Sequence, residues 1–176
     1  MKNKLIVSVG TYNWIKYCAG LVMTDDNKFH IMILSDESDK PIYNMQSLCK
    51  SAINSQRRHD LYVIGTKLNV SELICLGYDL ENVDLHKLTS ELQLKILLNN
   101  ISEVYYEAND ILDILFKKIA KEIGVAVYTF GRHGNKNVEL DEDTYRKKMM
   151  LRYDIVGVHN LNTLMYWPDT EVFGRI

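Results

Sequence analysis

The sequence ISEVYYEANDILDILFKKIAKEIGVAVYTF, residues 101–130, decides the fold class. Val104–Glu107 is a short run of β-branched and aromatic residues, which is typical of a strand. Asn109 or Asp110 then caps a helix in which apolar residues recur at helical spacing. Gly124 suits the position that ends this helix, and Val125–Phe130 forms another strand. A strand, a helix and a strand in succession predict an α/β domain.

The flanking sequence extends this pattern in both directions. Before it, Leu85–Ile101 has helical spacing, and after it a helix begins near Asp141. At the amino-terminal side, Leu5–Val9, Ile15–Met23 and Phe29–Leu34 read as three strands of an antiparallel meander. We therefore expect an α/β fold with a mixed sheet of about five strands and flanking helices, the meander being joined by parallel strands.

The middle of the chain is less regular. Tyr43–Gln56 has the spacing of a helix that ends at the polar residues 57–60, and Leu61–Ile64 and Leu73–Leu76 read as short strands. Residues 36–84 are expected to be an insertion in a single domain that spans residues 1–176.

Composition excludes several classes of protein. The 176 residues are 47% hydrophobic and 25% charged, which indicates a folded chain. A net charge of −2 excludes a uniformly basic nucleic-acid coat, and no apolar run has the length of about 18 residues that spans a bilayer. Three cysteines that lie far apart indicate neither a disulfide framework nor a zinc cluster. We expect an intracellular protein, and its many Asn, Lys and Ile residues suggest an AT-rich, viral genome.

Three short motifs carry a resemblance to a known superfamily. Val7-Ser8-Val9-Gly10-Thr11-Tyr12-Asn13 and Val104-Tyr105-Tyr106-Glu107 resemble the first and central strands of Holliday-junction resolvases of the RuvC, fungal mitochondrial and poxvirus kinds. Gly131–Asn137, followed by Asp141, is similar to the His loop and final Asp of true ribonucleases H. The resemblance implies a ribonuclease H-like fold for most of the chain.

The resemblance also implies a site for two Mg²⁺ or Mn²⁺ ions that cleaves phosphodiesters. Glu107 and Asp141 would be catalytic metal ligands, and His133 would assist proton transfer. The metal set would be completed from Glu91, Asp110 and Asp143. Each of these acids also has a simpler explanation, because Asp110 suits a helix cap, Glu91 a solvated helix face, and Asp141–Asp143 the start of a helix.

One position departs from the superfamily pattern. The Asp expected on the first strand is replaced by Ser8, or by Val9 in the other register, and a serine hydroxyl is a weak ligand that does not substitute for a carboxylate on Mg²⁺. If His159 and Asn162 match the two acids that the resolvase pattern places on the last helix, those acids are lost too, and Asp141 and Asp143 are the nearby substitutes. The sequence therefore favours a catalytically degenerate relative that acts as a nucleic-acid or protein binding module. The alternative is an active endonuclease on branched DNA or on an RNA/DNA hybrid.

Basic residues of the second half suggest how nucleic acid would be contacted. If they share one face they would bind phosphates, and otherwise they form ordinary solvated helix faces. The residues are Arg132, Lys136, Arg146, Lys147 and Lys148. The aromatic tail Tyr166-Trp167-Pro168 would stack a base or contact a protein partner, so DNA, RNA, another protein and a second copy of the chain are all candidate partners, whereas a membrane is not.

Overall fold

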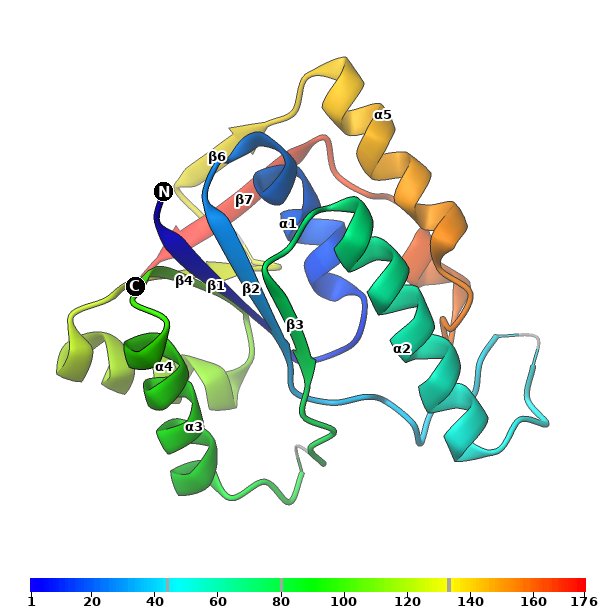
Figure 1. Ribbon diagram of the computed structural model, residues 1–176, viewed down its shortest axis with the longest axis horizontal. Coiled ribbons are helices and arrows are strands. Elements are labelled where there is room, and N and C mark those ends of the chain that lie inside the picture. The colour runs from blue at the N-terminus through cyan, green and yellow to red at the C-terminus, as the bar shows by residue number, and fades with distance from the viewer. Residues whose placement is uncertain (44, 80, 133) are drawn as a thin grey trace.

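The molecule is built on one sheet of seven strands in the order β3-β2-β1-β4-β5-β7-β6 (Figure 1). The structure is a computed structural model, and it describes residues 1–43, 45–79, 81–132 and 134–176. The strands are β1 (Asn3–Ser8), β2 (Lys28–Ile33), β3 (Glu72–Cys75), β4 (Ile101–Glu107), β5 (Ala126–Phe130), β6 (Lys136–Glu139) and β7 (Thr170–Arg175). The first five strands are parallel to one another, and β7 is antiparallel to both β5 and β6.

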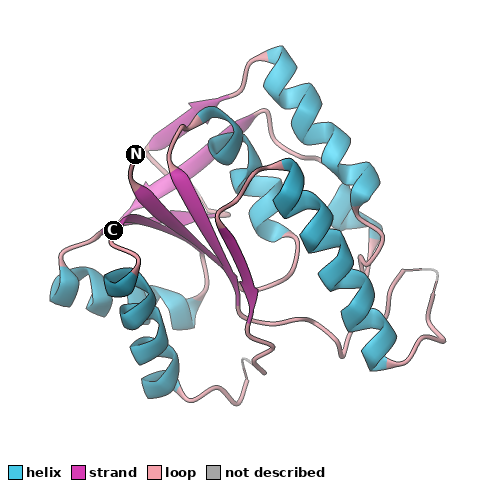
Figure 2. Cartoon of the chain, in the orientation of Figure 1, coloured by secondary structure: helices cyan, strands magenta, loops and turns pink. Residues whose placement is uncertain are grey.

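Helices cover both faces of this sheet (Figure 2). They are α1 (Asn13–Thr24), α2 (Lys50–Lys67), α3 (Leu85–Leu98), α4 (Asp110–Ile123) and α5 (Glu142–Met150), followed by two 3₁₀ turns, η1 (Leu151–Asp154) and η2 (Leu161–Leu164). The buried side chains of α1 and α2 share one hydrophobic core, and those of α3 and α4 share the other. The result is a three-layer α/β/α arrangement.

The alternation of side chains along the central strands divides these two cores. Ile6 of β1 packs in the core beneath α1 and α2, whereas Leu5 and Val7 pack beneath α3 and α4. On β4, Tyr105 faces the first core and Tyr106 the second. Both strands are buried on two faces, as is usual for parallel strands covered by helices.

The predicted α/β class with a mixed sheet and flanking helices is confirmed, but the sheet has seven strands rather than about five. The predicted antiparallel meander is wrong. Residues 15–23 lie in α1, and β1 and β2 are parallel neighbours joined by that helix. A parallel pair needs such a crossover, whereas a meander needs only tight turns.

The middle of the chain also differs from the expectation. The helix α2 begins at Lys50 and continues through residues 57–64, so the predicted break at residues 57–60 and the short strand Leu61–Ile64 are wrong. Leu73–Leu76 does form a strand, β3, at the edge of the sheet. Residues 36–84 thus contribute one helix and one strand of the common sheet. In the part of the chain that the structure describes, no helix has the length and apolarity needed to cross a membrane.

Strand order fixes the place of the functional site. The chain builds β1, β2 and β3 outward in one direction through α1 and α2, and then returns through α3 to place β4 on the other side of β1. The loops that follow β1 and β4 therefore run to opposite sides of the sheet and leave a crevice between them. In open parallel sheets, ligands bind in the crevice at the carboxyl ends of the strands where this reversal occurs.

Candidate functional site

The centre of the candidate site is the carboxylate of Glu107, the last residue of β4. The buried Ser8 hydroxyl donates to its Oε2 atom at 2.8 Å, and the Val9 N–H donates to the same oxygen at 2.8 Å. The side-chain amide of Asn13 donates to Oε1 at 2.6 Å. Three neutral donors thus hold both oxygens, and the first turn of α1 adds the favourable field of a helix amino terminus.

A polar cleft of about 580 Å³ opens beside this carboxylate, at the carboxyl ends of β1, β2 and β3. Val9, Gly10 and Asn13 form the wall that the cleft shares with the Glu107 cluster. Five carboxylates and two ammonium groups also line it, and these are Asp36, Glu37, Asp39, Asp79, Glu81, Lys40 and Lys50. Five negative and two positive charges give the cleft a net charge of −3, so it favours cations.

Glu37 is the most buried of these acids, with 9% of its surface exposed. Its carboxylate accepts the Thr11 N–H at 3.0 Å and pairs with the Lys40 ammonium at 2.9 Å. Burial raises the pKa of this carboxyl, but the Thr11 N–H and Lys40 outweigh it and leave the pKa below its ordinary value. A Cβ atom on Gly10 would lie 3.0 Å from the Glu37 carboxylate, so a side chain there would displace the carboxylate by a few tenths of an ångström.

A buried Arg57 fixes the loop that carries Glu37. Its guanidinium, on α2, donates to the carbonyls of Glu37, Lys40 and Gly157, the last at 2.8 Å. The side chain is 1% exposed, and carbonyl oxygens surround it. The helix α2 therefore clamps residues 36–40, which form one wall of the cleft, to the segment around Gly157.

Asp60, one turn later on α2, completes the clamp from the other side. It accepts the Tyr12 hydroxyl at 2.8 Å and the N–H groups of Val156 and Gly157 at 2.9 and 2.7 Å. Burial, followed by the nearby Asp60 charge, raises the pKa of Tyr12 far above its ordinary value. The phenol therefore keeps its proton and donates to Asp60, which ties the start of α1 to α2.

A more apolar hollow of about 720 Å³ opens next to Gly131, just after the end of β5. Tyr17, Gly131, Arg132 and Pro168 line it. Tyr17 follows Asn13 by one turn of α1, and burial together with the charge of Glu107 raises the pKa of its hydroxyl. Arg132 there pairs with Asp113 at 2.7 Å.

The acids predicted to surround Glu107 have other partners. Glu91 accepts the Tyr78 hydroxyl at 2.6 Å, and the 98%-exposed Asp110 side chain reaches Arg132 at 3.3 Å. Asp141 caps α5 by accepting the Thr144 N–H at 2.7 Å, and Asp143 pairs with Lys147. Glu107 is at the strand end where the sequence placed it, but these acids do not join it. His133 lies outside the described residues.

A metal ion at this site would need several ligands from the described residues. No three His, Cys, Asp or Glu side chains among them converge as a metal site, and both oxygens of Glu107 already accept hydrogen bonds from neutral donors. These residues do not fit a Mg²⁺, Mn²⁺ or Zn²⁺ centre, each of which needs several anionic or imidazole ligands.

The basic residues expected to contact nucleic acid are mostly engaged with acids. Lys148 is fully buried in an ion pair with Glu171, at 2.6 Å, and cannot reach a phosphate. Arg146 and Lys147 pair with acids one turn earlier on α5. Lys136 lies over the Tyr105 and Tyr128 rings, and Arg132 pairs with two carboxylates.

The sequence did not indicate the partners of Glu107 or the clamp on α2. Ser8 and Asn13 lie 99 and 94 residues before Glu107, and no local pattern joins them. The polar run at residues 57–60 predicts a helix break, although the spacing of three between Arg57 and Asp60 places both on one helix face. A polar pair at that spacing within an amphipathic helix is the signal that could have revealed the clamp.

Comparisons with known proteins now extend these observations. No protein-family model matches the chain, and no curated protein sequence matches it. Solved structures do match. N,N'-diacetylchitobiose deacetylase from Pyrococcus horikoshii is similar with a TM-score of 0.80 at 12% identity, over 99% of this chain and 84% of that one. The zinc-inhibited form of a teicoplanin deacetylase gives 0.70 at 9% identity, over 89% and 84% of the two chains.

A third match shows that this fold carries more than one chemistry. The 4-carboxy-2-hydroxymuconate hydratase of Pseudomonas putida has a TM-score of 0.72 at 14% identity, over 95% of this chain and 83% of that one. The predicted ribonuclease H-like resemblance is therefore wrong, and so are both functions that rested on it, the degenerate nuclease-like binding module and the active endonuclease. The viral origin suggested by the composition has no support from these matches. This chain has the fold of the deacetylases and the hydratase.

Proposed function

We propose that this chain binds a hydroxyl-rich small molecule bearing an ammonium group, an amino saccharide in class, in the acidic cleft, and that it does so without metal-dependent hydrolysis. The hydrogen-bonded Glu107 carboxylate carries the proposal. It stands at the reversal point of the sheet, where ligands bind in this class of fold, and three neutral donors hold both of its oxygens in place.

The cleft supports the charge of the proposed ligand. Its net charge of −3 attracts a cation, and its exposed acids Asp39, Asp79 and Glu81 can accept hydrogen bonds from ammonium and hydroxyl groups. Glu37 and Asn13 lie deeper and are held in fixed positions by the Arg57 clamp and by Glu107. The fixed polar groups deep in the cleft can bind the hydroxyl groups of a saccharide, and the exposed acids at its edge can bind an amine on that saccharide.

The comparison with chitobiose deacetylase supports the saccharide class. That protein shares the fold and is named for an N-acetylated disaccharide, and removal of acetyl groups from such a sugar leaves amines. The described residues lack the ligand set for a metal, so we assign to this chain binding of the amine form and no hydrolysis.

Calorimetric titration with chitobiose, the free diamine, and with N,N'-diacetylchitobiose tests the ligand class. We expect the diamine to bind at least tenfold more tightly at low salt, and the difference to shrink as salt screens the cleft. The variant Asp79→Asn should reduce diamine binding, whereas Asp26→Asn, an exposed acid outside the cleft, should not. Equal affinity for the two sugars, or no binding of either, would contradict the proposal.

An acetate-release assay on the diacetyl sugar, with and without added Zn²⁺, tests the absence of hydrolysis. We expect no release above the protein-free control, and no stoichiometric metal by mass spectrometry of the purified protein. Release that disappears in Glu107→Gln would show that the chain is a hydrolase and would overturn this part of the proposal.

A further inference from the structure

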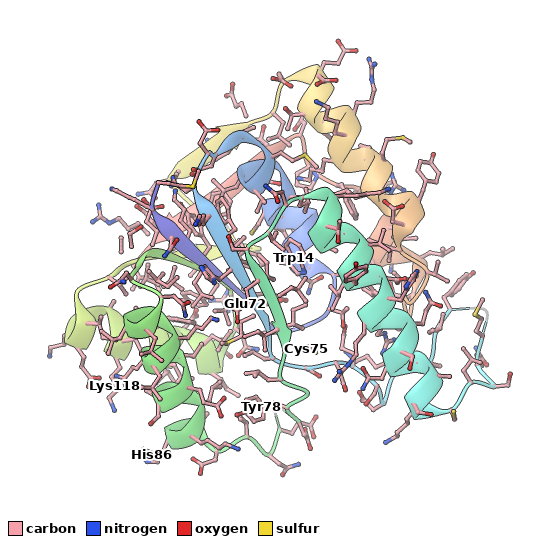
Figure 3. The ribbon with its side chains drawn as sticks, in the orientation of Figure 1. Trp14, Glu72, Cys75, Tyr78, His86 and Lys118 are labelled. Carbon is pink, nitrogen blue, oxygen red and sulfur yellow. The ribbon has the colours of Figure 1, made fainter. Side chains whose placement is uncertain are left out.

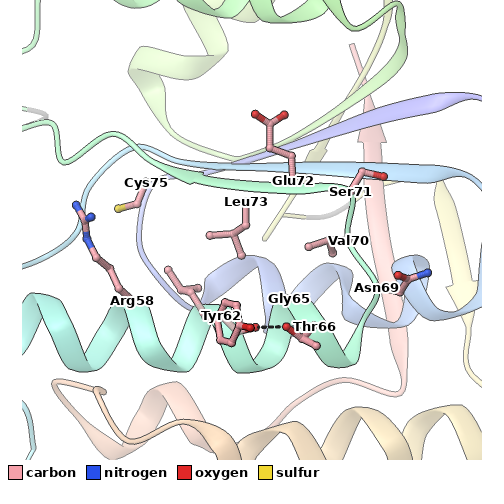
Figure 4. A pocket seen from close by; sticks show the side chains of 11 residues that line it. Arg58, Tyr62, Gly65, Thr66, Asn69, Val70, Ser71, Glu72, Leu73 and Cys75 are labelled. Atoms are coloured by element: carbon pink, nitrogen blue, oxygen red, sulfur yellow. Dashed lines mark hydrogen bonds between the residues drawn. The ribbon is translucent and has the colours of Figure 1, made fainter.

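A second hollow lies far along the sheet from Glu107, between α2 and the edge strand β3. It has a volume of about 480 Å³ and is bounded by α2, the loop after it, and β3 (Figure 4). Leu61 and Gly65 of α2 face Val70 and Leu73 across its floor. A Cβ atom on Gly65 would lie 3.3 Å from Val70, so the glycine allows the helix and the loop to approach closely and closes the groove at that end.

The strand along this groove has an unpaired edge. β3 is the last strand of the sheet and pairs only with β2, and Figure 3 places Glu72 and Cys75 on it in the opening between α2 and α3. Free N–H and C=O groups on an edge strand accept a further strand from another chain. Among the described elements nothing pairs with the outer side of β3.

The two edges of the sheet differ in their protection. The opposite edge strand, β6, has charged residues at both ends, Lys136 and Glu139, and charge on an edge discourages pairing. β3 reads Glu-Leu-Ile-Cys, and its one charged side chain, Glu72, bonds His30 and Lys95 on the face away from α2 (Figure 4). The other three residues of β3 are uncharged, so this edge carries less charge than β6, although Glu72 also lines the groove.

The two ends of the groove differ in charge. Arg58 lies at the end beside Cys75 (Figure 4). Its Nε donates to the neutral side chain of Asn54 at 2.8 Å, and none of the ion pairs among the described residues includes Arg58. The other charged lining residue, Glu72, is engaged with His30 and Lys95, so the exposed guanidinium is the charged group available to an occupant. A guanidinium binds a carboxylate through two parallel hydrogen bonds.

We propose that this groove binds an extended peptide segment that adds a strand to β3. An apolar side chain of the peptide enters between Leu61 and Leu73, and a carboxylate of the peptide pairs with Arg58. The Tyr62 ring, 73% exposed at the rim, covers the outer side of the bound segment. The carboxylate belongs either to an acidic side chain or to a chain terminus, which share the same chemistry.

A phage-displayed library of random heptapeptides with free carboxyl ends, selected on the full chain, provides the probe. We expect enrichment of peptides with alternating apolar residues and a carboxylate near one end. A synthetic peptide of the enriched sequence should bind Arg58→Glu and Tyr62→Ala at least tenfold more weakly than the parent chain. Arg146→Glu, an exposed arginine on α5, is the matched control and should leave affinity unchanged.

Two modified peptides test whether binding uses the backbone of the peptide or its carboxyl terminus. Methylation of alternate peptide nitrogens should abolish binding if the peptide pairs with β3, and a carboxyl-terminal amide should do so only if the terminus contacts Arg58. Circular dichroism must show that the variants are folded. Absence of enrichment, or equal binding by Arg58→Glu, overturns the proposal. A dimer in sedimentation that Arg58→Glu dissociates also overturns it, because a second copy would then occupy the groove.

Discussion

Lys148 and Glu171 form an ion pair in which both side chains have no exposed surface. The Glu171 carboxylate also accepts the N–H groups of Gly20 and Leu21 at 2.8 and 2.7 Å, and Lys148 donates to the Pro168 carbonyl at 3.0 Å. The pair joins α5 and β7 to the middle of α1. Removal of one buried charge leaves the other unpaired, which is far more harmful than loss of an exposed pair.

We predict that Lys148→Met lowers the free energy of unfolding by about 3–5 kcal/mol. The neighbouring Lys147→Met breaks only the exposed pair with Asp143, and should change the free energy of unfolding far less, because water screens an exposed ion pair. Urea denaturation of the two variants makes the comparison. Similar midpoints for both would show that the buried pair does not hold α5 in place.

Glu37 gives the molecule a predictable response to acid. Because its folded-state pKa lies below its ordinary value, its contribution to stability is present above the unfolded-state pKa and disappears as pH falls through the folded-state value. Glu37→Gln should therefore lose stability at pH 7 and should show a shallower decline between about pH 5 and pH 3 than the parent chain. Thermal unfolding of the parent chain and of Glu37→Gln across this pH range measures how steeply the stability of each falls. Parallel curves for the two proteins would contradict a lowered pKa for Glu37.

At the scale of elements, α4 could be predicted and α1 could not. In α4 the apolar side chains keep one face, Asn109 caps the start by accepting the Ile111 N–H, and Gly124 ends the helix in the left-handed region at φ 76°. The apolar spacing, the helix cap and the terminating glycine therefore all predict the same helix. The first helix has apolar residues on nearly all sides because sheet, α2 and α5 surround it, so its periodicity is masked and the run resembled a strand.

Gly20, in the middle of α1, shows what this burial demands. A Cβ atom there would lie 2.4 Å from Leu140 and 3.0 Å from the Glu171 carboxyl carbon. Alanine normally favours a helix interior over glycine by about 1 kcal/mol, but we predict that Gly20→Ala destabilises the protein by about 1–3 kcal/mol through overpacking. Gly65→Ala, with its nearest contact at 3.3 Å, is the control in the same denaturation experiment. Stabilisation by Gly20→Ala would contradict the packing described for α1 and β7.

At the scale of the whole molecule, the site depends on contacts between distant parts of the chain. The position of Glu107 followed from its place at a strand end, but its donors come from the loop after β1 and from α1. Strand order decides which loops meet, and an antiparallel meander that includes residues 15–23 as a strand places the loop after β1 differently from the observed sheet. The acidic cleft was therefore not predicted, although each of its acids is visible in the sequence.

The Arg57 clamp links α2, the loop at residues 36–40 and the segment around Gly157. We predict that Arg57→Met destabilises the protein by about 3 kcal/mol or more, because several buried carbonyls lose a charged donor. Hydrogen exchange should quicken at residues 36–40 and 156–158, and chitobiose affinity should fall. Arg58→Met, at the exposed neighbouring position, should change neither measurement. Protection that is unchanged in Arg57→Met would show that the loop is held by other contacts.

The position of β7 between β5 and β6 has a consequence for how the protein is made. β6 precedes β7 along the chain but joins the sheet only through it. During translation β6 therefore has no template until residues 170–175 have left the ribosome, and Glu171 arrives at the same moment to neutralise Lys148. Until then Lys148 has no carboxylate partner and β6 has no neighbouring strand. A chaperone that prevents aggregation would therefore be most useful at this stage.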